Sequence, residues 1–182
     1  MKRYISILRG INVGGKRKIL MKELKELYED LGFSNITTYI QSGNVIFNCC
    51  SECTSVSIEN KIQTAILQKF KHDVPVIIRT ADELEKSFLN NPFIKTKNFE
   101  IEHLYLTFLK DVPSDENLRL INKIEFENDK FEIIGKDIFA YCSGKFSDSK
   151  LSIKFFESKL RTMATTRNWK TVSKLHEIST NG

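Results

Sequence analysis

The feature that most constrains the fold of this chain is an order of strand and helix signals that occurs twice. In the first half the order is strand, helix, two strands, helix and strand, at residues 4–8, 20–31, 36–41, 44–48, 58–70 and 75–79. Ser42-Gly43 predicts a two-residue hairpin turn between the paired strands. Thr80 and Glu83 have capping-box spacing, so a short helix is expected to follow.

The second half shows the same order, with one difference. A strand, a helix, two strands joined by Gly135-Lys136 and a helix are predicted at residues 103–109, 114–124, 131–134, 137–142 and 151–160. No fourth strand is evident there. Instead, Trp169, Val172, Leu175 and Ile178 predict a terminal helix.

The hairpins decide the fold class. A hairpin pairs its own strands antiparallel, so neither half is an all-parallel nucleotide-binding fold. The repeated order predicts an α+β protein made of two ferredoxin-like subdomains of β-α-β-β-α-β type with antiparallel sheets. We expect the first subdomain at residues 1–94 and the second, with the C-terminal helix, at residues 95–182, where 95–98 form a polar connector.

The composition excludes several classes of protein. A chain of 182 residues with 41% hydrophobic and 28% charged residues has the balance of a globular protein. Its apolar runs are shorter than the roughly 20 residues that a bilayer span requires, and MKRYISILRG is interrupted by polar residues too early for a signal peptide. We therefore expect a cytoplasmic protein with no membrane partner. The oligomeric state is not predicted.

Charge is distributed unevenly along the chain. Residues 1–25 contain eight Lys or Arg and one Glu, residues 26–144 contain 12 basic and 19 acidic side chains, and residues 145–174 contain eight basic and two acidic ones. If the two basic ends meet, they form a positive field that attracts nucleic acid or anionic small molecules. The alternative is that each run is simply a solvated face.

The first loop carries the most suggestive motif. Gly10, Asn12, Gly14, Gly15 and Lys16 belong to GINVGGK, which fits the G-x-x-x-x-G-K part of a phosphate-binding P-loop. The next position is an arginine where a P-loop has the Ser or Thr that holds magnesium, which disfavours a magnesium-dependent NTPase. Glycines and the surrounding cations still favour an anion, with Arg9 and Lys16 as its contacts. The alternative is a tight strand-to-helix turn.

Two further polar segments lie at predicted element ends. In the first hairpin, Gln41, Ser42 and Asn44 offer amide and hydroxyl groups, although turn chemistry alone accounts for Ser42 and Asn44. Before the terminal helix, the segment Thr165, Arg167, Asn168 and Trp169 offers a cation and a stacking plane to a ligand. The alternative for that segment is a helix cap with the chain's only tryptophan packed in the core.

Cysteine and histidine do not indicate a catalytic or metal centre. Cys50-Ser51-Glu52-Cys53 is a C-x-x-C motif between a predicted strand and helix, but Glu52 disfavours the thiolate. A zinc site would need two further ligands, so we expect reduced thiols and no metal or cofactor. Because no Ser/His/Asp, Cys/His or carboxylate pair stands out, catalytic residues are not predicted.

Three segments resemble a family signature. They are LRGINVGGK at residues 8–16, with Met21 and Leu24 after it, YIQSGNV at 39–45 and TTRNWKTV at 165–172. Together they resemble a bacterial family known as a domain of unknown function and typified by the LRGINVGGK opening. The resemblance spans essentially the whole chain, apart from the cysteine-rich residues 49–53. It implies a duplicated ferredoxin-like fold and no assigned activity, cofactor or catalytic residue.

These observations lead to three functional hypotheses. The first is a module that binds an anionic ligand, a single-stranded nucleic acid or a nucleotide, in a cleft where the glycine loop, the hairpin turn and the 165–169 segment converge. The second is a metal-independent enzyme that acts on a small phosphorylated or carboxylated metabolite in the same cleft. The third is a structural or oligomerisation protein in which these residues only stabilise turns.

Overall fold

The structure is a computed structural model that describes residues 1–94 and 100–181, so the predicted connector at 95–98 lies outside the described residues. The chain divides into two compact units. Unit 1 comprises Met1–Lys86 with Lys174–Gly182, and unit 2 comprises Ser87–Ser173. These bounds differ from the predicted 1–94 and 95–182, and the C-terminal residues join unit 1. One reason is that Arg3 donates a hydrogen bond to the carbonyl of Ile178, at 3.0 Å.

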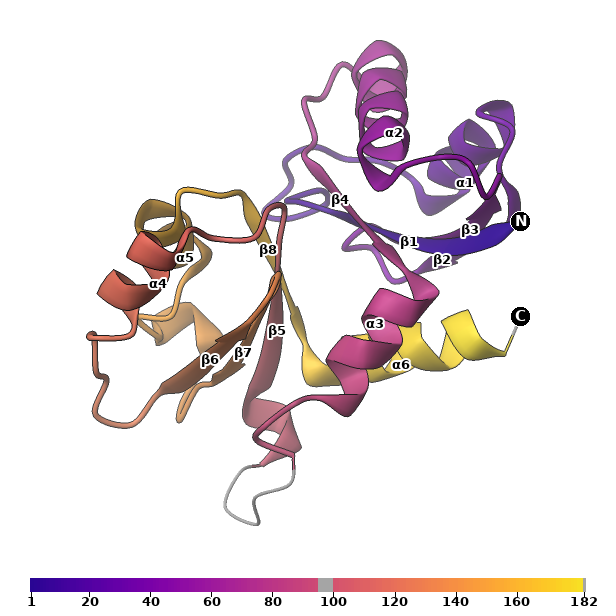
Figure 1. Cartoon of the computed structure of the whole chain (residues 1–182). Coiled ribbons are helices and arrows are strands. Elements are labelled where there is room, and N and C mark those ends of the chain that lie inside the picture. The colour runs from indigo at the N-terminus through magenta and orange to yellow at the C-terminus, as the bar shows by residue number, and fades with distance from the viewer. Residues whose placement is uncertain (95–99, 182) are drawn as a thin grey trace. The chain divides into compact units, whose positions relative to one another are not determined.

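Unit 1 contains a four-stranded antiparallel sheet covered by two helices (Figure 1). Its elements are β1 (Lys2–Leu8), α1 (Met21–Asp30), β2 (Ser34–Tyr39), β3 (Asn44–Cys49), α2 (Ser55–Phe70) and β4 (Val76–Thr80). The strand order is β2-β3-β1-β4. Alternate residues of β1 and β3, such as Tyr4 and Phe47, share one core with the buried faces of α1 and α2, so both helices pack on the same face of the sheet.

Local sequence explains where the helices of unit 1 begin and end. Gly32 follows α1 with φ of 79°, and its N–H donates to the carbonyl of Glu29. Thr54 caps α2, because its hydroxyl accepts from the N–H of Ser57. Under α1 the hydroxyls of Ser6 and Tyr28 lie 2.6 Å apart, which satisfies both groups inside the core.

Unit 2 repeats this architecture. Its elements are a 3-10 turn (Ile101–His103), β5 (Leu104–Leu109), α4 (Asp115–Ile121), β6 (Lys130–Ile134), β7 (Asp137–Tyr141), a second 3-10 turn (Phe146–Asp148), α5 (Ile153–Leu160) and β8 (Ala164–Asn168). The strand order β6-β7-β5-β8 is the same as in unit 1, with every pair antiparallel. The predicted fold class of two ferredoxin-like α+β subdomains is therefore confirmed.

Two local predictions were wrong. The second half does have a fourth strand, β8, which pairs with β5 from Ala164 opposite Leu109 to Asn168 opposite Tyr105. The first hairpin has a four-residue connection, residues 40–43, because Tyr39 pairs directly with Asn44. In contrast, the two-residue turn of the second hairpin is confirmed by the pairing of Ile134 with Asp137.

The remaining two helices follow the last strand of each sheet. α3 (Ala81–Leu89) begins with the predicted capping box, in which the Glu83 N–H donates to the Thr80 hydroxyl and the Thr80 N–H donates to the Glu83 carboxylate. α6 (Trp169–Thr180) is the predicted terminal helix, and the side chain of Asn168 accepts from the N–H of Thr171. Within the described ranges, no helix has the length and apolar content needed to cross a membrane.

Candidate functional site

The glycine loop of unit 1 folds as a miniature hairpin. Val13 and Lys16 form a β-bridge, with the Lys16 N–H donating to the Val13 carbonyl at 3.0 Å. Gly14 and Gly15 have φ of 57° and 74°, the left-handed values of a type I′ turn. A P-loop instead directs its backbone N–H groups at phosphate and leads straight into a helix. Here α1 begins only at Met21, so the loop does not form a P-loop.

Asn12 joins this loop to the first hairpin. Its Nδ2 donates to the carbonyls of Ile19 and Gln41, both at 2.9 Å. Its Oδ1 accepts from the Ile19 N–H, also at 2.9 Å. The residue has φ of 55°, a conformation that asparagine tolerates better than most side chains. Asn12 therefore acts as a scaffold between two segments 29 residues apart in the chain.

The hairpin turn packs directly against the loop. Asn44 is fully buried and donates to the Tyr39 carbonyl and the Ser42 hydroxyl, both at 3.1 Å. A Cβ on Gly43 would lie 2.7 Å from atoms of both Leu8 and Ile11. The structure thus brings together two of the three predicted segments, while Asn44 stabilises the turn rather than facing a ligand.

Unusual backbone conformation is concentrated in these two segments. Of the twelve described residues with positive φ, seven lie here: Gly10, Asn12, Gly14, Gly15, Arg17, Ile40 and Gly43. Ile40 has φ of 50°, which is costly for a β-branched side chain. Backbone strain of this kind is found where the surrounding structure enforces it, frequently at functional sites.

A hollow of about 360 Å³ lies between the loop, the turn and the start of α1. It is lined by Asn12, Gly15, Lys18, Ile19, Leu20, Glu23 and Gln41. Leu20 occupies the N-cap position of α1 and has no side chain that accepts a hydrogen bond there. The N-terminus of α1 therefore presents uncapped backbone N–H groups, which carry the positive end of the helix dipole.

Lys18 is the cation in the lining of this hollow, and further exposed cations lie beside it in the loop. Lys16, Arg17 and Lys18 are all exposed, and the Arg17 guanidinium reaches the Arg9 carbonyl at 3.4 Å. Arg9 itself is half-buried, and its backbone N–H donates to the carbonyl of Pro75, the residue before β4, at 2.9 Å. Glu23 is the acidic residue in the lining and works against an anion. Lys18 was not among the predicted ligand contacts, although it belongs to the basic run that drew attention to the loop.

The third predicted segment belongs to unit 2, so its convergence with the glycine loop stays a prediction. Arg167 is 8% exposed and donates to the Thr165 hydroxyl and the Thr166 carbonyl, and burial lowers the pKa of its guanidinium to about 10. Trp169 is 2% exposed and stacks on Phe88 at 5.6 Å. These contacts favour the cap-and-core interpretation over a cation and stacking plane that face a ligand.

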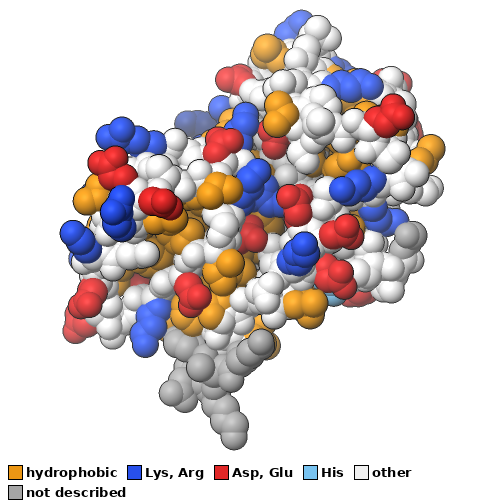
Figure 2. Space-filling view, viewed as in Figure 1, with side chains coloured by type: hydrophobic (Ala, Val, Ile, Leu, Met, Phe, Trp, Pro, Cys, Tyr) orange, Lys and Arg blue, Asp and Glu red, His pale blue; other side chains and the backbone are white. Residues whose placement is uncertain are grey.

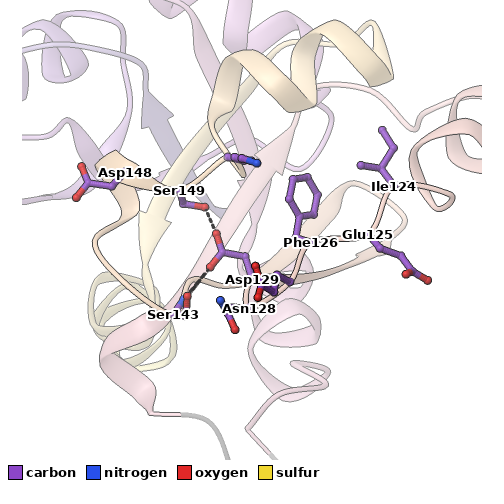
Figure 3. A pocket seen from close by; sticks show the side chains of 10 residues that line it. Ile124, Glu125, Phe126, Asn128, Asp129, Ser143, Asp148 and Ser149 are labelled. Carbon is purple, nitrogen blue, oxygen red and sulfur yellow. Dashed lines mark hydrogen bonds between the residues drawn. The ribbon is translucent and has the colours of Figure 1, made fainter.

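Unit 2 contains a second hollow, of about 470 Å³ (Figure 3). In it the Asp129 carboxylate accepts from the Ser143 N–H and hydroxyl and from the Ser149 hydroxyl. Partial burial acts to raise the pKa of Asp129, but these hydrogen bonds outweigh it and lower the pKa below its ordinary value. Because Glu125, Glu127 and Asp148 also line the hollow, it disfavours anions.

The view in Figure 2 shows basic and acidic side chains interspersed on one face of the molecule. This mixture resembles an ordinary solvated surface more than a continuous basic field.

The cysteines correct another expectation. Cys50 and Cys53 are joined by a disulfide, whereas reduced thiols were predicted. Cys49 and Cys142 are free and buried.

Comparison with known proteins places the chain in a family. A family model described as "Protein of unknown function (DUF1697)" matches residues 1–139. The chain belongs to DUF1697. The matched range includes the glycine loop and the hairpin turn, while the 165–172 segment lies beyond it.

A solved structure supports the fold of this DUF1697 member. The conserved bacterial protein SP0830 from Streptococcus pneumoniae is similar with a TM-score of 0.77 and 23% sequence identity, covering 98% of each chain. At this identity the likeness establishes the fold alone. No curated protein matches the sequence.

Proposed function

We propose that unit 1 binds the phosphate groups of single-stranded nucleic acid at the hollow between the glycine loop and the hairpin turn. The observation that carries this proposal is the uncapped N-terminus of α1, where Leu20 and Glu23, together with Lys18, line a hollow of about 360 Å³. Exposed Lys16 and Arg17 extend the cationic surface along the loop. Gln41 adds an exposed amide at the rim.

The residues divide into two roles. Asn12, Gly43 and Asn44 hold the loop and the turn in position through hydrogen bonds and close packing. Lys16 and Lys18 contact the ligand, because their ammonium groups are exposed and need no rearrangement to reach an anion. The backbone of this site is held in place, and its cations lie on exposed side chains. Such an arrangement suits a repeating phosphate chain, because binding of that chain depends on charge neutralisation more than on an enclosed pocket.

Salt dependence of oligonucleotide binding tests this proposal. Fluorescence anisotropy with a labelled single-stranded oligonucleotide should show affinity that falls steeply as salt rises, with a slope of about 0.7 per phosphate neutralised. Replacing Lys16, Arg17 and Lys18 together by alanine should weaken binding more than tenfold at low salt. The same triple variant should flatten the salt slope by about two units.

A matched variant controls for net charge. Lys150, Lys154 and Lys159 are exposed in unit 2, and replacing these three by alanine makes the same change in charge. The control variant should bind almost as the unaltered protein does. Equal losses in the two triple variants, or binding that does not depend on salt, would refute the proposed site. Tight binding of a mononucleotide in place of the oligonucleotide would favour the alternative of a small phosphorylated ligand.

A further inference from the structure

The chain places three cysteine sulfurs together at the junction of β3 and α2 in unit 1. Cys49 ends β3, Cys50 follows it, and Cys53 precedes the α2 N-cap residue Thr54. All three sulfurs lie within 4.8 Å of one another. A turn closes the group, since the Cys53 N–H donates to the Cys50 carbonyl at 3.3 Å.

We propose that Cys49, Cys50 and Cys53 form a zinc-binding thiolate site that opens when the Cys50–Cys53 disulfide is reduced. Thiolate is the softest ligand that a protein side chain offers, and Zn²⁺ binds it readily. Tetrahedral coordination with Zn–S bonds of about 2.3 Å places neighbouring sulfurs about 3.8 Å apart. The sulfurs of Cys49 and Cys50 are already 3.8 Å apart. For all three sulfurs to coordinate one metal ion, only the sulfur of Cys53 must move away from that of Cys50.

The surroundings of the group suit a bound metal. Cys49 is 8% exposed in the core of unit 1 and Cys53 packs against that core, while Cys50 is exposed and gives access from solvent. The Tyr4 hydroxyl donates to the Cys53 carbonyl at 2.9 Å and so restrains the third ligand from outside the coordination sphere. Lys2 lies opposite Cys49 in the strand register, which puts a cation on the face where negative sulfur would accumulate.

Binding requires two balanced steps. In the first, two equivalents of a small thiol transfer two electrons and two protons to the Cys50–Cys53 bond, yielding two cysteine thiols and the oxidised disulfide of the small thiol. In the second, the three cysteine thiols release three protons as their sulfurs bond to Zn²⁺. Water takes the fourth position. The reverse of the first step, in which the disulfide of the small thiol takes two electrons and two protons from Cys50 and Cys53, removes two ligands at once and releases the metal.

From the sequence we expected no metal, because only Cys142 and the histidines were considered as further ligands beside the C-x-x-C pair. Cys49 was not counted as a ligand. Adjacent residues of an extended strand ordinarily point to opposite faces, so its position next to Cys50 in the sequence does not by itself predict that the two sulfurs meet. At the end of β3 the chain turns, and this brings the sulfur of Cys50 back toward that of Cys49.

Metal titration of the full chain tests the site. Protein reduced with a phosphine and kept under anaerobic conditions is titrated with Zn²⁺ against a chromophoric chelator, and Cd²⁺ is added separately to record thiolate charge-transfer absorption. We expect one metal ion per chain in the reduced protein and none in the oxidised protein. Cys50→Ser and Cys53→Ser should each weaken Zn²⁺ binding at least tenfold and lower the Cd²⁺ absorption by about a third.

Cys142→Ser is the matched control, because Cys142 is a free, buried cysteine in unit 2. It should bind Zn²⁺ as the unaltered chain does. The proposal is overturned if reduced protein binds no metal, if oxidised protein binds equally well, or if Cys142→Ser is as defective as Cys50→Ser. Cys50 is exposed, so its serine variant should remain folded and keep the measurement interpretable. Failure of this test leaves oligonucleotide binding at the glycine loop unaffected, since the two sites share no residue.

Discussion

The close approach of Gly43 to β1 gives a quantitative prediction about the stability of unit 1. Gly43 has φ of 79°, a conformation that costs an L side chain about 1–2 kcal/mol. A Cβ there would lie 2.7 Å from the Leu8 Cβ, which is fixed to the strand backbone, and 2.7 Å from the Ile11 Cδ1. Overpacking of this kind costs a further 1–3 kcal/mol or so, and reduced freedom of the unfolded chain returns about 0.4–1 kcal/mol. Gly43→Ala should therefore destabilise unit 1 by about 3 kcal/mol.

Gly32→Ala is the matched control for this prediction. Gly32 has the same φ of 79° but no atom within 4 Å of an added Cβ, so only the backbone cost of about 1 kcal/mol applies. Hydrogen exchange of peptides from β1 and β3 is the appropriate assay, because a global unfolding curve would mix the two units. If both variants lose protection equally, the close packing of the turn against β1 is not what makes glycine necessary at position 43.

Two further perturbations address the scaffold and the second hollow. Asn12→Ala removes the side chain that bonds the N–H and carbonyl of Ile19 and the carbonyl of Gln41. Hydrogen-exchange protection around the loop and the turn should therefore fall by about 2–3 kcal/mol. Unchanged protection would show that Asn12 does not join the two segments. Asp129 has a pKa below its ordinary value, so its carboxylate stabilises unit 2 at neutral pH, and this contribution disappears as pH falls through the folded-state pKa. Asp129→Asn should therefore make unit 2 less stable than in the unaltered protein at pH 7 and equally stable in acid, as measured by hydrogen exchange of peptides from unit 2. A constant difference across pH would contradict the role given to the serine hydrogen bonds.

The location of the candidate site was only partly predictable. Glycine content and basic residues drew attention to the loop, and turn residues drew attention to the hairpin. Their meeting depends on the Asn12 side chain, which reaches the carbonyl of residue 41 across 29 positions of sequence. Arg167 illustrates the opposite case. Its charge favoured a surface role, yet its position on β8 buries it. That position is set by the pairing of Arg167 with Leu106 on β5, 61 residues earlier in the chain.

The sequence by itself determined the order of elements and the antiparallel hairpins, because periodicity, capping boxes and glycine turns are local signals that act within a few residues. Tertiary structure decided the rest. Ala164–Asn168 is short and polar and lacks the alternation of a half-buried strand, and it becomes β8 only because β5 offers an open edge for its backbone hydrogen bonds. Likewise, the three sulfurs near α2 and the hollow at α1 depend on where the chain turns back on itself, which no local pattern reports.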